Sequence, residues 1–203
     1  MSSAVSSEMQ SAEDGYEPTY SFKPSLMGVA REFRLSRDGL RWELGRHKGR
    51  IPYGAIRRIR LSYRPVTLQN HRFLAEVWAD GAPKLQVVSV SWRSLVEQER
   101  HDAAYKAFIR ALHQRIALAG AKPMLHVGTP PWVYWPGVAV FIACAVFLPY
   151  LLLRAMGEGS LGGVAIVGSL LVLLLWQVGA FFWRNQPGSY EVDAIPAKAL
   201  PRG

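Results

Sequence analysis

Arginines recur at alternate positions in one short segment of the chain, residues 55–65, which reads AIRRIRLSYRP. Successive side chains of an extended strand point to opposite faces, so Arg58, Arg60 and Arg64 share one face with Ile56 and Ser62. The opposite face carries Arg57, Ile59, Leu61 and Tyr63. Guanidinium groups can bind phosphate through two parallel hydrogen bonds. The first face is therefore a candidate anion-binding surface, and the second is expected to be mostly core.

A second basic group, Arg46, Lys48 and Arg50, lies in and just after a glycine-bounded segment that we expect to form a hairpin loop. With the three arginines of the strand, these residues make up the candidate site for anionic lipid. The alternative is a solvated cationic surface that Glu43 and Glu76 partly neutralise across the sheet.

The sequence lacks the patterns that are typical of catalytic and metal sites. Its five histidines have no metal-ligand spacing, and His113, on a predicted helix, is expected at the surface. Ser89 and Ser91 are not part of a Gly-x-Ser-x-Gly turn, and no glycine-rich loop carries a lysine for nucleotide phosphates. A single cysteine, Cys144, cannot form an internal disulfide. We therefore expect a noncatalytic protein without metal or cofactor, while an enzyme of unfamiliar pattern remains an open alternative.

Charge divides the chain into two unlike parts. Residues 22–128 carry twenty Lys and Arg against eight Asp and Glu, a net charge near +12, whereas residues 129–183 carry only Arg154 and Glu158. Such a shift predicts a solvated basic domain followed by a lipid-facing region. A pI near 10.0 is also common among nucleic-acid-binding proteins, but no reader motif is present. We expect no nucleic-acid partner.

Two uncharged apolar stretches, residues 132–153 and 161–183, predict two transmembrane helices. About 20 helical residues cross a hydrocarbon core of about 30 Å. The link, residues 154–160, is short enough to be a turn, so the two spans form a hairpin. Basic residues flank the hairpin at its two outer ends, which predicts a multi-pass membrane protein with both termini in the cytoplasm. Aromatic residues should mark that interface: Trp132, Tyr134, Trp135, Phe181, Phe182 and Trp183.

The remaining sequence predicts one domain over residues 22–120. Residues 1–21 are polar and are expected to be disordered, 121–131 a linker, and 184–203 a cytoplasmic tail. Short β-rich runs separated by turn residues between Arg31 and Trp92 predict an antiparallel meander. A helix is expected from Glu97 to Leu118 and should end near Gly120. Its apolar stripe consists of Tyr105, Phe108, Ile109, Leu112 and Ile116.

Three patterns carry a resemblance to a known family. These are Phe33-x-Leu35-x-x-x-Gly39-Leu40-x-Trp42, Ile51-Pro52-Tyr53-x-x-Ile56-x-x-Ile59, and the stripe Tyr105–Ile116. Over about residues 20–120 the chain resembles the pleckstrin-homology-like (PH-like) domains of small bacterial membrane proteins. In those proteins the membrane helices often precede the domain, whereas here they follow it. The resemblance implies an α+β fold, an antiparallel β-barrel or sandwich capped by one C-terminal amphipathic helix.

The same resemblance implies a binding module. Lys48-Gly49-Arg50 is similar to the Lys/Arg-x-Arg pattern that holds phosphoinositide phosphates in eukaryotic PH domains. We therefore expect a module anchored in the inner cell membrane that presents a basic domain to anionic lipid headgroups or to a protein partner. The alternative is an accessory subunit of a larger membrane complex, for transport or envelope synthesis, whose specificity lies in the transmembrane hairpin.

Overall fold

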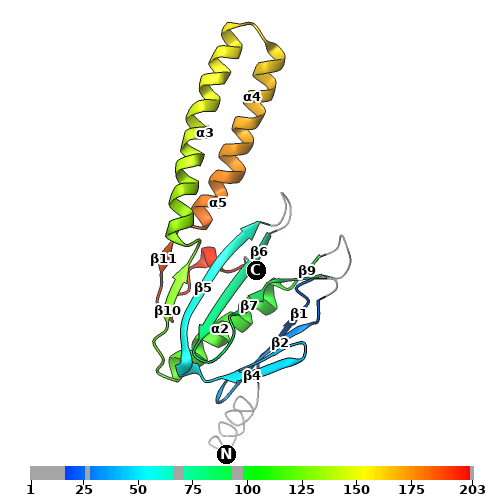
Figure 1. Ribbon diagram of the computed structural model, residues 1–203, viewed down its shortest axis with the longest axis vertical. Helices are drawn as coiled ribbons and strands as arrows, with labels where there is room; N and C mark the ends of the chain where they lie inside the picture. The colour runs from blue at the N-terminus through cyan, green and yellow to red at the C-terminus, as the bar shows by residue number, and fades with distance from the viewer. Residues whose placement is uncertain (1–16, 26–27, 66–70, 93–97, 202–203) are drawn as a thin grey trace, which may run out of the picture.

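A computed structural model describes residues 17–25, 28–65, 71–92 and 98–201. The protein is α+β: among the described residues two larger β-sheets, a two-stranded ladder and the helix α2 (Asp102–Leu118) form a domain, from which a long helical hairpin projects (Figure 1). The first sheet is an antiparallel meander of four strands in the order β1-β2-β3-β4. Its strands are β1 Thr19–Phe22, β2 Arg31–Ser36, β3 Gly39–Leu44 and β4 His47–Ile51.

The second sheet has five strands in the order β11-β10-β5-β6-β7. Its strands are β5 Ile56–Pro65, β6 His71–Ala79, β7 Leu85–Val88, β10 Met124–Val127 and β11 Gly188–Ser189. Strands β5, β6 and β7 form the predicted antiparallel meander, while β10 adds parallel to β5. A separate two-stranded ladder joins β8 Val90–Trp92 to β9 Gln98–Arg100. In the described strand orders, neither sheet closes on itself.

Helix α2, Asp102–Leu118, supplies the apolar side chains that fill the space between the sheets. Its predicted stripe is confirmed, because all five of its residues are buried: Tyr105, Phe108, Ile109, Leu112 and Ile116. On the sheets these side chains meet residues such as Phe33 and Tyr20, whose rings lie 6.4 and 5.6 Å from that of Phe108. The helix ends as predicted before Gly120, whose φ of 64° suits a residue without a side chain.

Local expectations differ from the structure at three places. The segment expected to be a hairpin loop largely forms strand β4, and only residues 45–46 make the turn. A bulge between Ile56 and Arg58 shifts the register of β5, so Ile56 faces the core rather than joining the arginines. Gln98–Arg100, which were expected to be helical, instead form β9, and α2 begins at Asp102.

The hairpin consists of α3, Pro131–Gly157, and of a second helix that runs from Leu161 to Arg184. The second helix contains α4 Leu161–Leu173, a π-helical turn Leu174–Val178 and α5 Gly179–Arg184. At about 1.5 Å per residue, both exceed the length needed to cross a bilayer. The mean hydropathy of the most apolar window is 2.3 in each, and none of that window is buried. Both helices are thus long and apolar enough to be membrane spans.

The boundaries around the hairpin also differ from those expected. Within residues 1–21, the part from Thr19 onward forms β1, and the expected linker contains β10. The expected tail returns to the domain, where it forms β11 and buries Ala199 and Leu200 in the core. Chain on both sides of the hairpin therefore belongs to one folded unit. Residues 1–16 of the expected disordered segment lie outside the described residues.

Candidate functional site

The structure distributes the six predicted site residues over separate surfaces. Lys48 and Arg50 lie on β4 of the first sheet, and Arg46 lies in the turn that precedes it. The other three, Arg58, Arg60 and Arg64, lie along β5 of the second sheet. They do not form a single site, so each surface has its own chemistry.

On the outer face of the first sheet, three arginines lie side by side across neighbouring strands. Arg34 of β2 is directly opposite Arg41 of β3, which is directly opposite Arg50 of β4. We call Arg34, Arg41 and Arg50 the arginine row. Their neighbours Phe33, Leu35, Leu40 and Ile51 point the other way and are buried, so strand alternation fixes the row on the exposed face. Only Arg50 of this row was predicted as a site residue.

The arginine row lines a shallow hollow of about 440 Å³. Alongside it, Glu32, Glu43 and Lys48 form a second row of opposed residues. Glu32 accepts a hydrogen bond from Arg34 at 2.9 Å, and Asp38 lies 3.6 Å from Arg50. Among the described residues, Arg41 has no ion pair. The hollow therefore offers a ligand the guanidinium of Arg41, which no carboxylate pairs with among the described residues.

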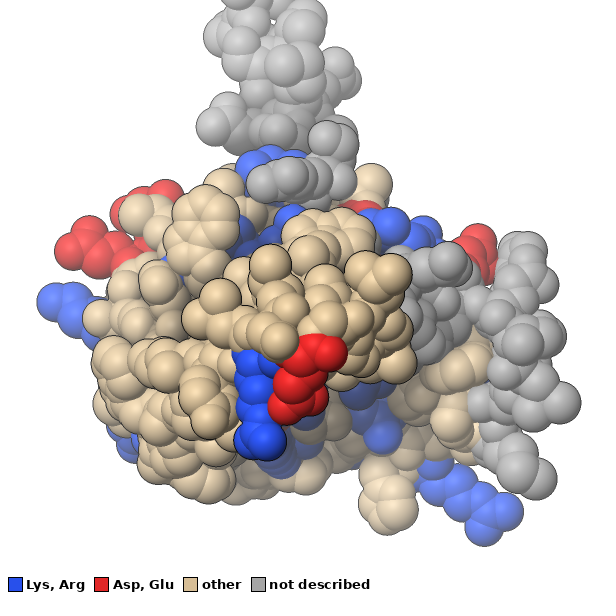
Figure 2. All heavy atoms as spheres, turned by 90° about the horizontal axis from the view of Figure 1, so that it is seen from above, with Lys and Arg blue, Asp and Glu red and all other residues tan. Residues whose placement is uncertain are grey.

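The place of this hollow in the molecule restricts what can reach it. The first sheet lies at the end of the domain away from the helical hairpin (Figure 1). Viewed along the hairpin axis, the surface in front is mostly uncharged, and blue Lys and Arg atoms gather around the domain behind it (Figure 2). The arginine row thus belongs to the sheet that lies farther from the hairpin.

Arg58 and Arg60 on the second sheet are engaged by an aromatic residue. Their guanidinium carbons lie 5.8 and 5.6 Å from the ring centre of Trp78, and the amine of Lys84 lies 4.9 Å from it. Lys84 also forms an ion pair of 2.5 Å with the buried carboxylate of Glu76. Cation–π contacts and this ion pair hold the group together internally. The cations of this group are therefore less available to an external anion than those of the arginine row.

Arg64 lies farther along the same strand, directly opposite Arg72 of β6. This pair is at the end of the sheet that adjoins the hairpin (Figure 1). Neither Arg72 nor Trp78 was predicted, although alternation from Phe73 in β6 would have placed both on the arginine face.

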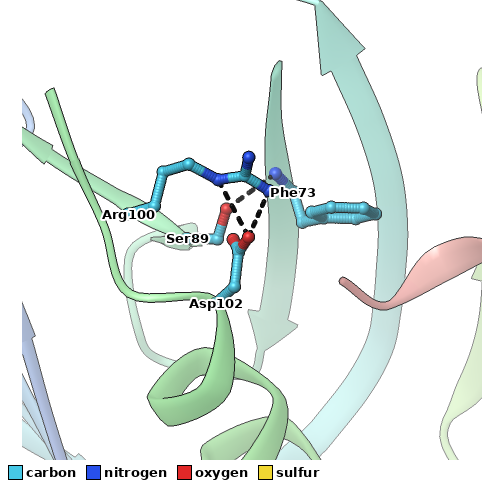
Figure 3. A network of polar contacts seen from close by, with 4 residues as sticks. All are labelled: Phe73, Ser89, Arg100 and Asp102. Atoms are coloured by element: carbon cyan, nitrogen blue, oxygen red, sulfur yellow. Dashed lines mark hydrogen bonds and ion pairs between the residues drawn. The ribbon is translucent and has the colours of Figure 1, made fainter. Parts of the chain in front are cut away.

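Ser89, which lacks the sequence context of a nucleophile, has a structural role (Figure 3). Its fully buried hydroxyl accepts a hydrogen bond of 3.0 Å from the backbone N–H of Phe73, and its carbonyl accepts one of 2.8 Å from His101. Beside it, Nε of Arg100 donates to Asp102, the first residue of α2, at 2.9 Å. These contacts connect Ser89, the residue between β7 and β8, to strand β6 and to the start of α2.

His113 was expected at the surface but is buried, and it connects the helix to the chain that follows the hairpin. Its Nδ1 lies 2.8 Å from the carbonyl oxygen of Ile109, so Nδ1 carries the proton, since a carbonyl can only accept. Its Nε2 then accepts from the hydroxyl of Tyr190 at 2.9 Å. Burial lowers the pKa of His113, which favours this neutral form. The partner lies 77 residues away in sequence, so helix periodicity alone did not indicate it.

The hairpin is joined to the second sheet by a buried asparagine, Asn185, directly after α5. Its side-chain oxygen accepts a hydrogen bond of 3.1 Å from the backbone N–H of Tyr63, and its carbonyl accepts one of 3.0 Å from Thr129. The guanidinium of Arg184 lies 5.0 Å from the ring centre of Tyr63. At the same end, the rings of Tyr134 and Phe182 contact each other across the two helices, with their centres 5.6 Å apart. These contacts fix the orientation of the domain relative to the hairpin.

The molecule thus combines an apolar hairpin, a domain fixed to its base, and a row of arginines at the opposite end of that domain. The site that this arrangement offers is one for an anionic group, held by guanidinium donors on a rigid sheet. No protein-family model matches the chain, and no curated protein or solved structure shows significant similarity to it.

Proposed function

We propose that this protein is a noncatalytic binding module anchored in the bacterial inner membrane. In this proposal the hairpin crosses the bilayer twice, both termini are cytoplasmic, and a PH-like domain presents the arginine row to an acidic segment of a protein partner. The observation that carries the proposal is the direct opposition of Arg34, Arg41 and Arg50 across three strands.

The length and hydropathy of the two helices support membrane anchoring. Exposed indole rings at the domain end of the hairpin, those of Trp132, Trp135 and Trp183, are typical of a membrane–water interface. The far turn of the hairpin contains one ion pair, Arg154 with Glu158, and most basic residues are on the domain side. This asymmetry supports a cytoplasmic domain.

The proposal of a PH-like domain rests on the order and packing of the elements. A meander of strands precedes one amphipathic helix, α2, whose apolar side buries residues of both sheets. A helix that packs against both sheets, as α2 does here, is placed to close one open end of a small barrel or sandwich. The added strands β10 and β11 extend the second sheet beyond that plan.

Like charges directly opposite one another destabilise a sheet by a few tenths to about 1 kcal/mol per pair. An anionic ligand removes this repulsion and gains charge-assisted hydrogen bonds, each worth about 1.5–3 kcal/mol. A row of three guanidinium groups suits carboxylates that are spaced along an extended acidic peptide. Because the row lies at the end away from the hairpin, lipid of the same bilayer is a poor candidate for this surface.

Binding of a labelled Glu-rich peptide to the full-length protein, held in nanodiscs of zwitterionic lipid, tests the proposal. We expect the double variant Arg34→Gln/Arg41→Gln to bind the peptide at least about tenfold more weakly, since two charge-assisted contacts are lost. The matched control is Arg57→Gln/Arg110→Gln, which removes the same charge from two other exposed positions. Its affinity should stay within about threefold of the original.

Equal weakening in both double variants would show that binding follows net charge alone and would refute the role of the row. If no acidic peptide bound even at low salt, the arginine row would not be a binding surface. That result would favour the alternative function, an accessory subunit whose specificity lies in the hairpin.

A further inference from the structure

A second pair of opposed arginines lies at the hairpin end of the second sheet. Arg64 of β5 and Arg72 of β6 are direct cross-strand neighbours, so their side chains leave the sheet on the same face. Arg64 is exposed and Arg72 is half-buried. Neither has an ion pair among the described residues. Two like charges are therefore held together with one of them partly withdrawn from water.

Two buried polar atoms at this pair, one on Arg72 itself and one on Ser62, have no hydrogen-bond partner among the described residues. They are Nε of Arg72 and the hydroxyl of Ser62, which lies two residues before Arg64 on the same face. Burial, together with the charge of Arg64, lowers the pKa of Arg72. Leaving a buried donor unpaired is unfavourable, because the group loses its hydrogen bonds to water without gaining others. The arrangement is unfavourable as it stands and would be relieved by one anion.

The pair lies at the level where the hairpin leaves the domain. Tyr63, the residue before Arg64, donates its backbone N–H to Asn185 and packs its ring beneath the guanidinium of Arg184, the last residue of α5. In Figure 1 the end of β5 lies beside α5 at the base of the hairpin. If the hairpin crosses a bilayer, this end of the sheet is at the headgroup layer.

We propose that Arg64, Arg72 and Ser62 bind the phosphate group of an anionic phospholipid in the leaflet next to the domain. The proposal rests on the membrane anchoring described under the proposed function and assigns a lipid to a surface distinct from the arginine row. Two guanidinium groups and a hydroxyl supply donors for several phosphate oxygens. The phosphate charge opposes the repulsion between the arginines, while Arg184 and Asn185 position the strand.

The test compares thermal unfolding of the delipidated full-length protein in a non-ionic detergent with added phosphatidic acid, phosphatidylcholine or inorganic phosphate. We expect phosphatidic acid to raise the melting temperature of the original protein and phosphatidylcholine to leave it unchanged. In Arg64→Gln/Arg72→Gln the apparent Kd for phosphatidic acid should rise at least about tenfold, because each basic residue near an anionic surface contributes about 1 kcal/mol. Without lipid this variant should melt no lower than the original, since it removes a repulsive pair.

The variant Arg34→Gln/Arg41→Gln is the matched control, because it removes another cross-strand pair of arginines at the far end of the domain. This control should still respond to phosphatidic acid but should bind the acidic peptide more weakly. Arg64→Gln/Arg72→Gln should bind the peptide normally but should respond less to phosphatidic acid. Failure of one proposal is thereby separated from failure of the other.

Three results would overturn the lipid site. These are an unchanged response to phosphatidic acid in Arg64→Gln/Arg72→Gln, an equal loss in both double variants, and an equal shift with inorganic phosphate at the same concentration. The last result would assign the site to a soluble anion. As a second variant, Arg64→Glu should pair with Arg72, melt no lower than the original protein, and lose the response to phosphatidic acid.

Discussion

Replacing Gly128 by alanine is expected to destabilise the protein by about 3 kcal/mol, because this residue lies at the joint between sheet and hairpin. Its φ of 83° is in the left-handed region, where a side chain is strained. An added Cβ would also lie 2.3 Å from the carbonyl oxygen of Gln186 and 2.5 Å from that of Asn185. The backbone N–H of Gly128 donates to Leu61 at 2.8 Å, so the chain cannot move aside without losing this bond.

Thermal unfolding measures this effect, and two other glycines separate its causes. Gly81 has a φ of 69° with open space around its Cβ position, so Gly81→Ala should show the dihedral strain without the clash. Gly54 has neither feature, and Gly54→Ala should change the melting temperature little. At about 2–4 °C per kcal/mol for a chain of this size, Gly128→Ala should melt about 6–12 °C lower. A loss no larger than that of Gly81→Ala would refute the close approach at the joint.

Ending the chain at Ser189 is expected to destabilise the domain by about 4 kcal/mol or more. The removed segment buries Ala199 and Leu200 in the core and packs Tyr190, Val192 and Ile195 against it. Burying a large aliphatic side chain contributes about 1.5–3 kcal/mol. Loss of Tyr190 also leaves Nε2 of His113 without its partner, an additional penalty of about 1–3 kcal/mol for a group that stays buried.

The resistance of the domain to limited proteolysis, together with its melting temperature, measures the effect of this truncation. The control is a full-length variant with Glu191, Asp193 and Lys198 changed to serine, since all three side chains are exposed. It changes the composition of the same segment without removing core contacts, and it should unfold near the original temperature. A truncated protein as stable as this control would show that the segment after the hairpin is a tail, as the sequence indicates.

Local pattern predicted those elements whose signal is contained within one strand or helix. The stripe on α2 has helical spacing, and β5 to β7 alternate around clear turn residues, so both were predictable. Strand β4 was not, because Gly49 and the charged residues around it are typical of a loop. In the structure the ring of Trp42 occupies the space of a missing side chain, with an added Cβ at Gly49 only 2.6 Å from it. That contact depends on strand register, which the composition of the segment does not reveal.

The candidate site was predictable in part for the same reason. Alternation correctly set Arg58, Arg60 and Arg64 on one face, but it gave no indication that Trp78 engages the first two. The arginine row could have been found by alternation in β2 and β3, since Phe33 and Leu40 fix the inward face. Its significance depends on cross-strand register, which brings Arg34, Arg41 and Arg50 into line.

The remaining differences between prediction and structure arise from contacts between residues far apart in the sequence. The segment after the hairpin has weak periodicity of its own, and its residues are buried only because the hairpin brings them back to the sheet. His113 is buried for this reason, through Tyr190. A sequence pattern that spans neighbouring residues carries no information about such contacts.

The central claim, that the hairpin lies within a bilayer, can be tested at one native residue. Cys144 is the chain's single cysteine and lies in the middle of α3, about 20 Å along the helix from each end. A nitroxide attached to it in the full-length protein in nanodiscs reports collisions with oxygen, which partitions into lipid, and with a charged nickel chelate, which stays in water. The account predicts high accessibility to oxygen and very low accessibility to the chelate. Accessibility to the chelate that exceeds that to oxygen would contradict it.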